Sequence, residues 1–181
     1  SMAHDLSLLE RERVDLVFTP ALETMYPIGF DTYVEVGHVA ARLEGEHRPS
    51  HFRGVATIVE KLFAIIRPDR AYFGQKDGQQ VAVIKRMARD LNTGVEIIAM
   101  PTVREHDGLA LSSRNAYLNS SERKAATVLY RALCAANDCF QQGERRAQHL
   151  RGVAISVLAE EPLARTDYVS IATQDTIQEM E

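Results

Sequence analysis

Residues 72–80, Tyr-Phe-Gly-Gln-Lys-Asp-Gly-Gln-Gln, combine glycines with a lysine and an aspartate at the end of an apolar run. An apolar-periodic segment begins directly afterwards at Val81, so the pattern predicts a strand, a turn and then a helix. Glycine lets the backbone approach a ligand closely, and the first turn of a helix offers unpaired N–H groups. Lys76 placed there can reach a phosphate as a mobile point charge. Taken alone, the stretch also fits a plain strand-to-helix turn with a surface lysine.

Three other polar clusters adjoin the predicted regular elements. Arg48–Gly54 precedes a long helix, Pro101–Arg104 follows a strand, and Leu111–Asn115 lies in an irregular segment. Ligands of open parallel sheets bind beyond the carboxyl ends of the strands, which is where the clusters after residues 73 and 100 fall. Hydroxyls beside a guanidinium, as in Leu111–Asn115, suit a phosphate or an acyl-phosphate transition state. The sequence therefore suggests an anion site.

Each cluster also has an ordinary structural interpretation. Serines can be turn residues, arginines and acids can form surface ion pairs, a histidine can start a helix, and glutamines can be solvated helix positions. These alternatives apply to Ser112, Ser113 and Arg114, to Arg104, Glu105 and Asp107, to His51, and to Gln79 and Gln80. The sequence contains no GxGxxG, P-loop, HExxH, GxSxG or Cys/His metal spacing, so a dinucleotide oxidoreductase has little support and no metal site is predicted.

The elements that must position these clusters follow an α/β order. Polar residues 5–12 suit a helix, and a strong amphipathic helix runs from about residue 55 to Ile66, where Pro68 stops it. A strand at 70–73, a helix over about 78–91 and a strand at 95–100 follow. Apolar strands alternating with helices predict a parallel sheet covered on both faces. Short strands are also predicted at Val14–Phe18 and Tyr33–Val36, with mainly loop over 37–51.

A different pattern begins at Pro101. Residues 101–118 show no clear periodicity, and Asn119 with Glu122 then resembles a capping box. The helix that follows ends near Gly143, a second helix covers about 146–159, and residues 168–172 alternate like a strand. The apolar face predicted for the first helix is formed by Ala126, Leu129, Leu133, Ala136 and Phe140. This order predicts a smaller α+β domain after a boundary near residues 101–115.

Composition limits the possible partners. The 181 residues are 45% hydrophobic and carry a net charge of −4, which gives no electrostatic reason to expect binding to nucleic acid or membrane. No apolar run is long enough to cross a bilayer, and no secretory signal pattern is present. Cys134 and Cys139 lie five residues apart without other metal-ligand spacing, so they are predicted to be free thiols of a cytoplasmic protein.

Three segments together carry a specific resemblance: RPSHFRGVATIV, RPDRAYFGQKDGQQVAVIKRM and PTVREHDGLALSSRNAYL. In this order and spacing they closely resemble the pantoate–β-alanine ligase family, from about residue 5 to the C-terminus. The resemblance implies an α/β fold, with an incomplete Rossmann-like nucleotidyltransferase (HUP-type) parallel-sheet domain over 3–110. A small, incomplete α+β domain over 111–181 would follow. It implies a ligase that makes pantothenate, for coenzyme A biosynthesis, from pantoate, β-alanine and ATP through a pantoyl adenylate.

The resemblance also implies roles for particular residues. Those expected to bind ATP are Gly74, Gln75, Lys76, Asp77, Val103, Leu111, Ser112, Ser113 and Arg114. Of these, Lys76, Ser112, Ser113 and Arg114 are expected to be catalytic. Gln80, His51 and Arg48 are expected near pantoate, the last two with the phosphates as an alternative. ATP is a substrate in this scheme, and Mg²⁺ is expected with it.

The sequence departs from the family at both ends. Members of the family carry an upstream first strand and a HIGH-like motif whose histidines hold the phosphates, and they continue beyond residue 181. We therefore expect a fragment with little or no activity by itself. The alternative function is a catalytically incomplete fragment that folds, binds nucleotide or self-associates. A sheet that lacks its first strand exposes edges and apolar surface, which favours a homodimer or another self-association.

Overall fold

A computed structural model describes residues 2–181, which divide into two compact units: one within the first 32 residues and one from Tyr33 to Glu181. The first unit contains helix α1 (Met2–Arg11), as predicted, and the short helix α2 (Leu22–Met25). The predicted strand at Val14–Phe18 is wrong. This run has no strand pairing and is exposed, with Leu16 at 76%. Apolar residues form a stable strand only when they pair and bury one face, and residues 2–32 contain no second strand.

The second unit is built on two parallel strands, β1 (Arg70–Gly74) and β2 (Glu96–Met100), which pair with Tyr72 opposite Ile98. Helix α6 (Gly78–Asp90) connects them, and helix α5 (His51–Ile66) precedes them. All four elements were predicted. The parallel pairing is confirmed, and it places the carboxyl ends of both strands at the same edge.

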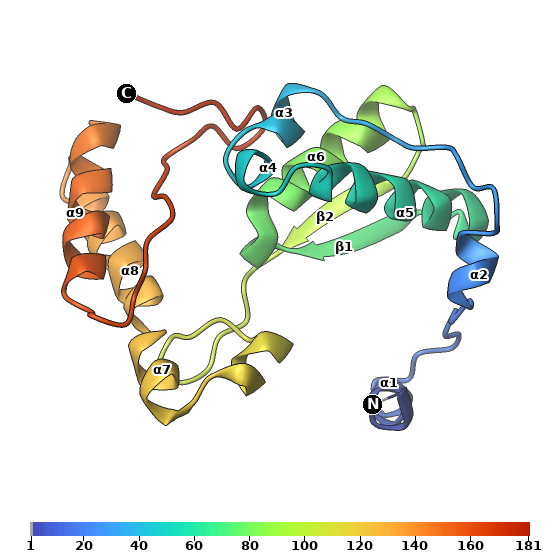
Figure 1. Ribbon diagram of the computed structural model, residues 1–181, viewed down its shortest axis with the longest axis horizontal. Coiled ribbons are helices and arrows are strands. Elements are labelled where there is room, and N and C mark those ends of the chain that lie inside the picture. Colours follow the sequence, from blue (N-terminus) through green and yellow to red (C-terminus); the bar gives the residue numbers. More distant parts are fainter. Residues whose placement is uncertain (1) are drawn as a thin grey trace. The chain divides into compact units, whose positions relative to one another are not determined.

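Both helices cover the same face of this sheet (Figure 1). Ala71, Phe73 and Ile97 pack there against a buried cluster. The cluster consists of Ala56 and Phe63 from α5 with Ile84 and Met87 from α6. The opposite face carries Tyr72, which is 60% exposed, and Met100. The prediction that both faces are covered is therefore wrong for residues 2–181, because α5 and α6 pack side by side rather than on opposite faces.

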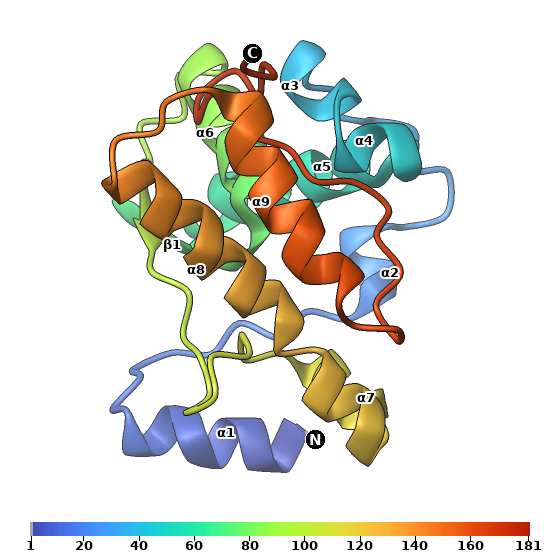
Figure 2. The same ribbon diagram turned by 90° about the vertical axis from the view of Figure 1, so that its left-hand side faces the viewer.

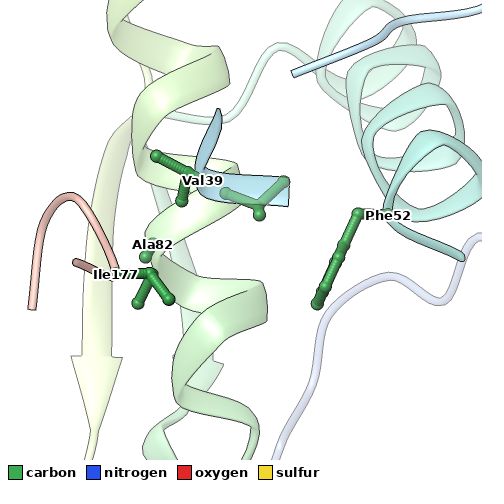
Figure 3. Packing of buried hydrophobic residues seen from close by; sticks show 5 residues of the cluster. Val39, Phe52, Ala82 and Ile177 are labelled. Atoms are coloured by element: carbon green, nitrogen blue, oxygen red, sulfur yellow. The ribbon is translucent and has the colours of Figure 1, made fainter. Parts of the chain in front are cut away.

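Residues 33–50 depart from the predicted strand and loop. Tyr33–Val36 is not a strand, because the Val34 N–H donates to Thr57 Oγ1 on α5 at 2.9 Å instead of to a neighbouring strand. The predicted loop contains the short helices α3 (His38–Ala41) and α4 (Glu44–His47). They bring Val39 into a buried cluster with Phe52 of α5 and Ala82 of α6 (Figure 3).

The chain after residue 111 is mostly helical. A 3₁₀ helix at Ser113–Tyr117 is followed by α7 (Ser120–Ala125), α8 (Val128–Gln141) and α9 (Ala147–Ala159). The capping box at the start of α7 and the second predicted helix are confirmed. Helices α8 and α9 lie side by side (Figure 2).

The single helix predicted from residue 120 to near Gly143 is split. At Thr127 the N–H bonds to the Lys124 carbonyl, three residues back, which tightens the turn between α7 and α8. The buried positions Ala125 of α7 and Val128 and Ala132 of α8 keep helical spacing, each one residue before a position of the predicted face. Val128 and Ala132 are buried against α9, whereas Leu129, on the predicted apolar face, is 58% exposed.

The C-terminal segment returns to α6. Residues 168–172 do not form a strand, because their pairing is limited to one antiparallel bridge between Ala172 and Glu179. Ile177 is buried beside Val39 and Ala82 (Figure 3), and Arg42 donates to its carbonyl oxygen at 3.4 Å. The predicted domain boundary near residue 110 stays a prediction. In the part of the chain described here, no helix combines the length and apolar character needed to cross a membrane.

Candidate active site

A cavity of about 240 Å³ lies in the second unit, at the carboxyl end of β1 and the start of α6. Side chains from four places in the sequence line it: the α4–α5 junction, the β1–α6 turn, the 3₁₀ helix after Ser112, and the C-terminal segment. The lining residues are Glu44, Arg48, His51, Phe52, Lys76, Asp77, Gly78, Gln79, Gln80, Arg114 and Tyr168. The fold thus brings Arg48, His51, Lys76, Asp77, Gln80 and Arg114 together, as expected of a shared site.

Lys76 stands where the strand turns into the helix. Gln75–Asp77 form one 3₁₀ turn, and α6 begins at Gly78. The side chain of Lys76 is 37% exposed, and its ammonium lies 3.3 Å from Asp77 Oδ1. The first N–H groups of α6 have no carbonyl partner within the helix, and the positive end of the helix dipole lies here. A lysine and a helix N-terminus therefore border the same cavity.

The charges around the cavity favour an anionic ligand. Two of its cations have partners: Arg48 lies 3.3 Å from Glu44, and Lys76 contacts Asp77. Both pairs are substantially exposed to solvent. Arg114 has no side-chain partner among residues 2–181 and is exposed at the cavity edge. Three cations thus face two carboxylates, and the unpaired guanidinium is free to form a bidentate contact with a phosphate or carboxylate.

Two neighbouring glutamines of α6 differ in their contacts. The Gln79 amide donates to the carbonyls of Val39 and Arg42, at 2.9 and 2.6 Å, and accepts from the Glu44 N–H at 3.1 Å. The sequence-based alternative that Gln79 is a solvated helix position is therefore wrong. Gln80 is half-buried, lines the cavity and has no such backbone partners. Its amide remains available to a ligand.

Tyr168 closes part of the cavity from the C-terminal segment. Its ring stacks on His47 at 5.2 Å, with the two planes 8° apart. Burial raises the pKa of the Tyr168 hydroxyl, and the nearby Glu44 carboxylate raises it further. Tyr168 was not predicted as a site residue from the sequence, because the alternating pattern at 168–172 predicts a strand. Phe52, which lies within the Arg48–Gly54 cluster, and Glu44, four residues before it, were not predicted as site residues either.

The remaining predicted ATP-binding residues lie outside the cavity lining. Gly74 and Gln75 are exposed at the end of β1. Val103 and Leu111 are joined by a 2.9 Å hydrogen bond from the Leu111 N–H to the Val103 carbonyl. This pairing, which was not predicted from the sequence, places two segments expected to contact ATP side by side.

Ser112 and Ser113 follow Leu111 and directly precede Arg114, which lines the cavity. Ser112 Oγ accepts the Arg114 N–H at 3.2 Å and so caps the 3₁₀ helix that begins at Ser113. This cap supports the turn-residue interpretation for Ser112. Ser113 is exposed. Arg114 is therefore the member of this group that reaches the cavity.

The size of the cavity limits what it can enclose. At about 240 Å³ it lies below the roughly 300–1,000 Å³ that is typical of pockets for drug-sized ligands. It suits a phosphate group or a small carboxylic acid rather than an entire nucleotide. Residues 2–181 contain no cluster of three or more His, Cys, Asp or Glu side chains that could hold a metal ion.

Comparisons with known proteins agree on one family. The family described as Pantoate-beta-alanine ligase matches residues 1–181. A pantothenate synthetase of Roseiflexus sp. (strain RS-1) is 59% identical over 180 residues, which make up 99% of this chain and 65% of that protein. One from Dehalococcoides mccartyi (strain CBDB1) is 55% identical over 175 residues, or 97% of this chain and 65% of that protein. The chain therefore spans about 65% of the length of these curated relatives.

Solved structures agree with the sequence matches. The crystal structure of pantothenate synthetase from Thermus thermophilus superposes with a TM-score of 0.96 at 47% identity, covering 99% of this chain and 65% of that one. A pantoate-beta-alanine ligase from Francisella tularensis, complexed with beta-gamma ATP and beta-alanine, gives a TM-score of 0.71 at 34% identity. That match covers 87% of this chain and 58% of that protein. The predicted nucleotidyltransferase-type α/β fold is confirmed.

Proposed function

The chain belongs to the pantoate–β-alanine ligase family, and from this premise we propose that the whole protein condenses pantoate with β-alanine at the expense of ATP. The cavity at the start of α6 carries the proposal, because Lys76, Arg114, Arg48 and Gln80 surround one small space of net positive charge. The substrates pantoate and ATP are both anions. β-Alanine brings a carboxylate and the attacking amine.

The proposed reaction has two steps. A carboxylate oxygen of pantoate attacks the α-phosphorus of ATP, and the bond to the β-phosphate breaks, which yields pantoyl adenylate and pyrophosphate. The amine of β-alanine then attacks the acyl carbon and loses a proton, and AMP leaves with its bonding electrons. Negative charge moves onto pyrophosphate in the first step and onto AMP in the second. Fixed cations and N–H donors therefore contribute most of the catalysis.

The cavity residues can be assigned to these charges. Lys76 and the first N–H groups of α6 neutralise phosphate oxygens, and Arg114 adds a fork of donors from the 3₁₀ helix at Ser113–Tyr117. Gln80 holds pantoate, because an amide serves a hydroxyl and a carboxylate equally well. Arg48 and His51 border the same space and complete the pantoate end. Val103 meets the adenine through its backbone, and Leu111, Ser112 and Ser113 contact the rest of the nucleotide.

Mg²⁺ enters this scheme with ATP rather than in a protein cage. The described residues offer no cluster of ligands, and Mg²⁺ in nucleotide sites keeps several waters and binds mainly to substrate phosphates. When bound, it would shield the phosphate charge, and Asp77 is the carboxylate of the cavity turn that could contact it.

The test uses the whole protein. We expect AMP release that requires pantoate, β-alanine and ATP together, and we expect Lys76→Ala to slow adenylate formation by roughly 10²–10³-fold, as for the loss of one preorganised charge-stabilising donor. Single-turnover pyrophosphate release measures this step. Lys85→Ala, on α6 but outside the cavity lining, is the matched control. An unchanged rate in Lys76→Ala would exclude Lys76 as a phosphate contact, and AMP release without pantoate would contradict the reaction.

The chain of 181 residues has its own expected behaviour. We propose that it is inactive alone, and that it self-associates through the exposed face of the sheet that carries Tyr72 and Met100. AMP release near the rate of the whole protein would refute the first statement. Monomers at high concentration in analytical ultracentrifugation would refute the second. The free thiols of Cys134 and Cys139 and the use of ATP support a cytoplasmic location.

A further inference from the structure

Residues 103–111 form a tight hairpin that neither the cavity nor the proposed chemistry explains. Within it, the Glu105 N–H bonds to the Leu109 carbonyl at 2.8 Å, and the Gly108 N–H bonds to the Glu105 carbonyl at 2.9 Å. The bond between Leu111 and Val103 closes its base. We call Val103–Leu111 the 103–111 hairpin. Its two ends are the residues expected to meet the nucleotide, so whatever holds the hairpin also places them.

Arg123 of α7 binds this hairpin through both terminal nitrogens of its guanidinium. Nη2 lies 2.6 Å from Glu105 Oε2, and Nη1 lies 2.8 Å from Asp107 Oδ2. The three side chains are only 25–32% exposed, unlike the surface pair of Arg86 and Asp90, which is 49% exposed on both sides. The hydrogen bond from Arg123 holds the pKa of Asp107 below its usual range. A planar fork that engages two carboxylates fixes direction as well as distance.

Asn115 links the Glu105 carboxylate to the segment that contains Arg114, which lines the cavity. Its Nδ2 donates to Glu105 Oε1 at 3.3 Å and to the Ala110 carbonyl at 3.0 Å. Glu105 therefore receives Arg123 on one oxygen and Asn115 on the other. Because Asn115 directly follows Arg114, the position of the hairpin is coupled to that of the cavity guanidinium.

The tip of the hairpin rests on α8. Gly108 is buried with a φ of +91°, and a Cβ there would lie 1.9 Å from Cδ1 of Tyr130. Only glycine meets both demands, since the left-handed backbone disfavours a side chain and the Tyr130 ring occupies the space that a Cβ would need. The Arg104 guanidinium lies 4.3 Å from the centre of the Tyr130 ring and donates to the Gly108 carbonyl at 3.1 Å. The tip is thus anchored independently of Arg123.

From these contacts we propose that Arg123 is a positioning residue for ATP. It holds the 103–111 hairpin through Glu105 and Asp107, and thereby places Val103, Leu111 and Arg114 for the nucleotide. The proposal rests on the proposed function for its effect on ATP, but the coupling between Arg123 and the hairpin can be measured without it. Arg123 does not line the cavity, so its loss should leave the pantoate site unchanged.

The experiment compares Arg123→Gln with the unmodified whole protein by amide hydrogen exchange and steady-state kinetics. The protection of the Glu105 and Leu111 amides should fall by roughly ten- to a hundredfold, the effect of hydrogen bonds to a charged group. The KM for ATP should rise about tenfold while the KM for pantoate stays within about twofold. Arg123→Lys keeps the charge but loses the fork, so it should recover part of both effects.

Two controls separate this effect from a general loss of charge. Arg131→Gln removes an exposed arginine of α8, and Arg86→Gln breaks the exposed pair with Asp90; both should leave the hairpin amides and the KM for ATP unchanged. If Arg123→Gln does not fold, Glu105→Gln tests the same contact with a smaller change. Unchanged hairpin protection would overturn the proposal, and so would equal rises in the KM values for ATP and pantoate. If the unmodified whole protein makes no AMP, and Arg123→Gln still loses hairpin protection, the proposed function is refuted and the coupling between Arg123 and the hairpin is established.

Discussion

Gln79 and Gln80 are adjacent in the sequence, but the structure gives them different tasks. Gln79 holds the α3–α4 segment through three backbone contacts, whereas Gln80 faces the cavity. A side chain that satisfies two carbonyls and one N–H in a half-buried place stabilises the fold there, and its removal leaves those groups without partners. The neighbouring residue is left to bind a ligand.

Substitution of the two glutamines should therefore separate stability from function. Gln79→Ala is expected to lower the free energy of unfolding by about 2–3 kcal/mol, from three lost hydrogen bonds of roughly 1 kcal/mol each. Gln80→Ala should change stability by less than about 0.5 kcal/mol and raise the KM for pantoate in the whole protein. Urea denaturation of both variants measures the first difference. Equal destabilisation by the two substitutions would contradict it.

Glu144 lies just before α9, and its carboxylate contacts several residues at the start of that helix. Its carboxylate accepts from the Arg146 guanidinium, from the N–H groups of Arg145 and Arg146, and contacts His149 Nδ1 at 2.6 Å. The Arg146 contact, followed by these N–H groups, holds the pKa of Glu144 well below its ordinary value of 4.5. A carboxyl whose pKa falls on folding stabilises the protein above its unfolded pKa and loses that contribution as the pH falls.

Glu144→Gln should accordingly lower the melting temperature at pH 7 and have progressively less effect as the pH falls from 4.5 toward 2. Thermal unfolding at a series of pH values, for the variant and for the unmodified chain, measures this convergence. Glu160→Gln, at an exposed carboxylate beyond the other end of α9, is the matched control and should show little pH-dependent difference. A difference in melting temperature between Glu144→Gln and the unmodified chain that stays constant across this pH range would contradict the lowered pKa of Glu144.

At the scale of elements, α7 is short, yet it carries Arg123, which forms ion pairs with the 103–111 hairpin. Its six residues cannot form a stable helix by propensity alone, so its start must be fixed. The capping box does this. Asn119 Oδ1 accepts the N–H groups of Ser121 and Glu122, and the Glu122 carboxylate accepts the Asn119 N–H at 2.9 Å. Arg123 is the next residue, so the cap that fixes the start of α7 also fixes the backbone position of Arg123.

Asn119→Ala should cost about 1 kcal/mol of stability through loss of the cap, whereas Asn119→Ser should cost less because serine is also a good cap. Guanidinium denaturation compares the two. If the cap also directs Arg123, the hairpin amides should exchange faster in Asn119→Ala than in Asn119→Ser. Identical exchange in both variants would limit the cap to a local role.

At the scale of the second unit, the C-terminal segment packs against helices α3, α5 and α6 through Ile177. Ile177 is 8% exposed in the cluster with Val39 and Phe52, although its φ of +52° is strained for a β-branched residue. Arg42 supports the same turn from the end of α3 by donating to the carbonyls there. Tyr168, on the way to this turn, reaches the cavity because the segment is held at its far end.

Ile177→Ala should therefore lower stability by about 2 kcal/mol, the low end for a buried isoleucine, because relief of the strained side chain offsets part of the lost packing. Ile155→Ala, at a 48% exposed position of α9, should change it by less than about 0.5 kcal/mol. Urea unfolding with exchange of the Thr173 and Ile177 amides measures both effects. Similar losses from the two substitutions would show that the cluster does not anchor the segment.

The sequence by itself determined the family and the regular elements with a strong local pattern. Local patterns predicted helices at about 55–66, 78–91 and 146–159 and strands at 70–73 and 95–100, which the structure has at 51–66, 78–90, 147–159, 70–74 and 96–100. The Asn119 cap follows from residues three apart. The grouping of Arg48, Lys76, Gln80 and Arg114 around one space was expected from the family resemblance, and their roles there remain predictions. Local patterns suffice for elements because their hydrogen bonds join residues close in sequence.

Only the tertiary structure decided the rest. It made Gln79 structural, brought Tyr168 to the cavity, left Val14–Phe18 without a strand partner, and joined Arg123 to Glu105 and Asp107. It also covered a single face of the sheet, since α5 and α6 pack together on the side of Ala71 and Phe73. Each of these outcomes depends on which distant side chains compete for the same surface or the same hydrogen bond, and a local pattern contains no record of that competition.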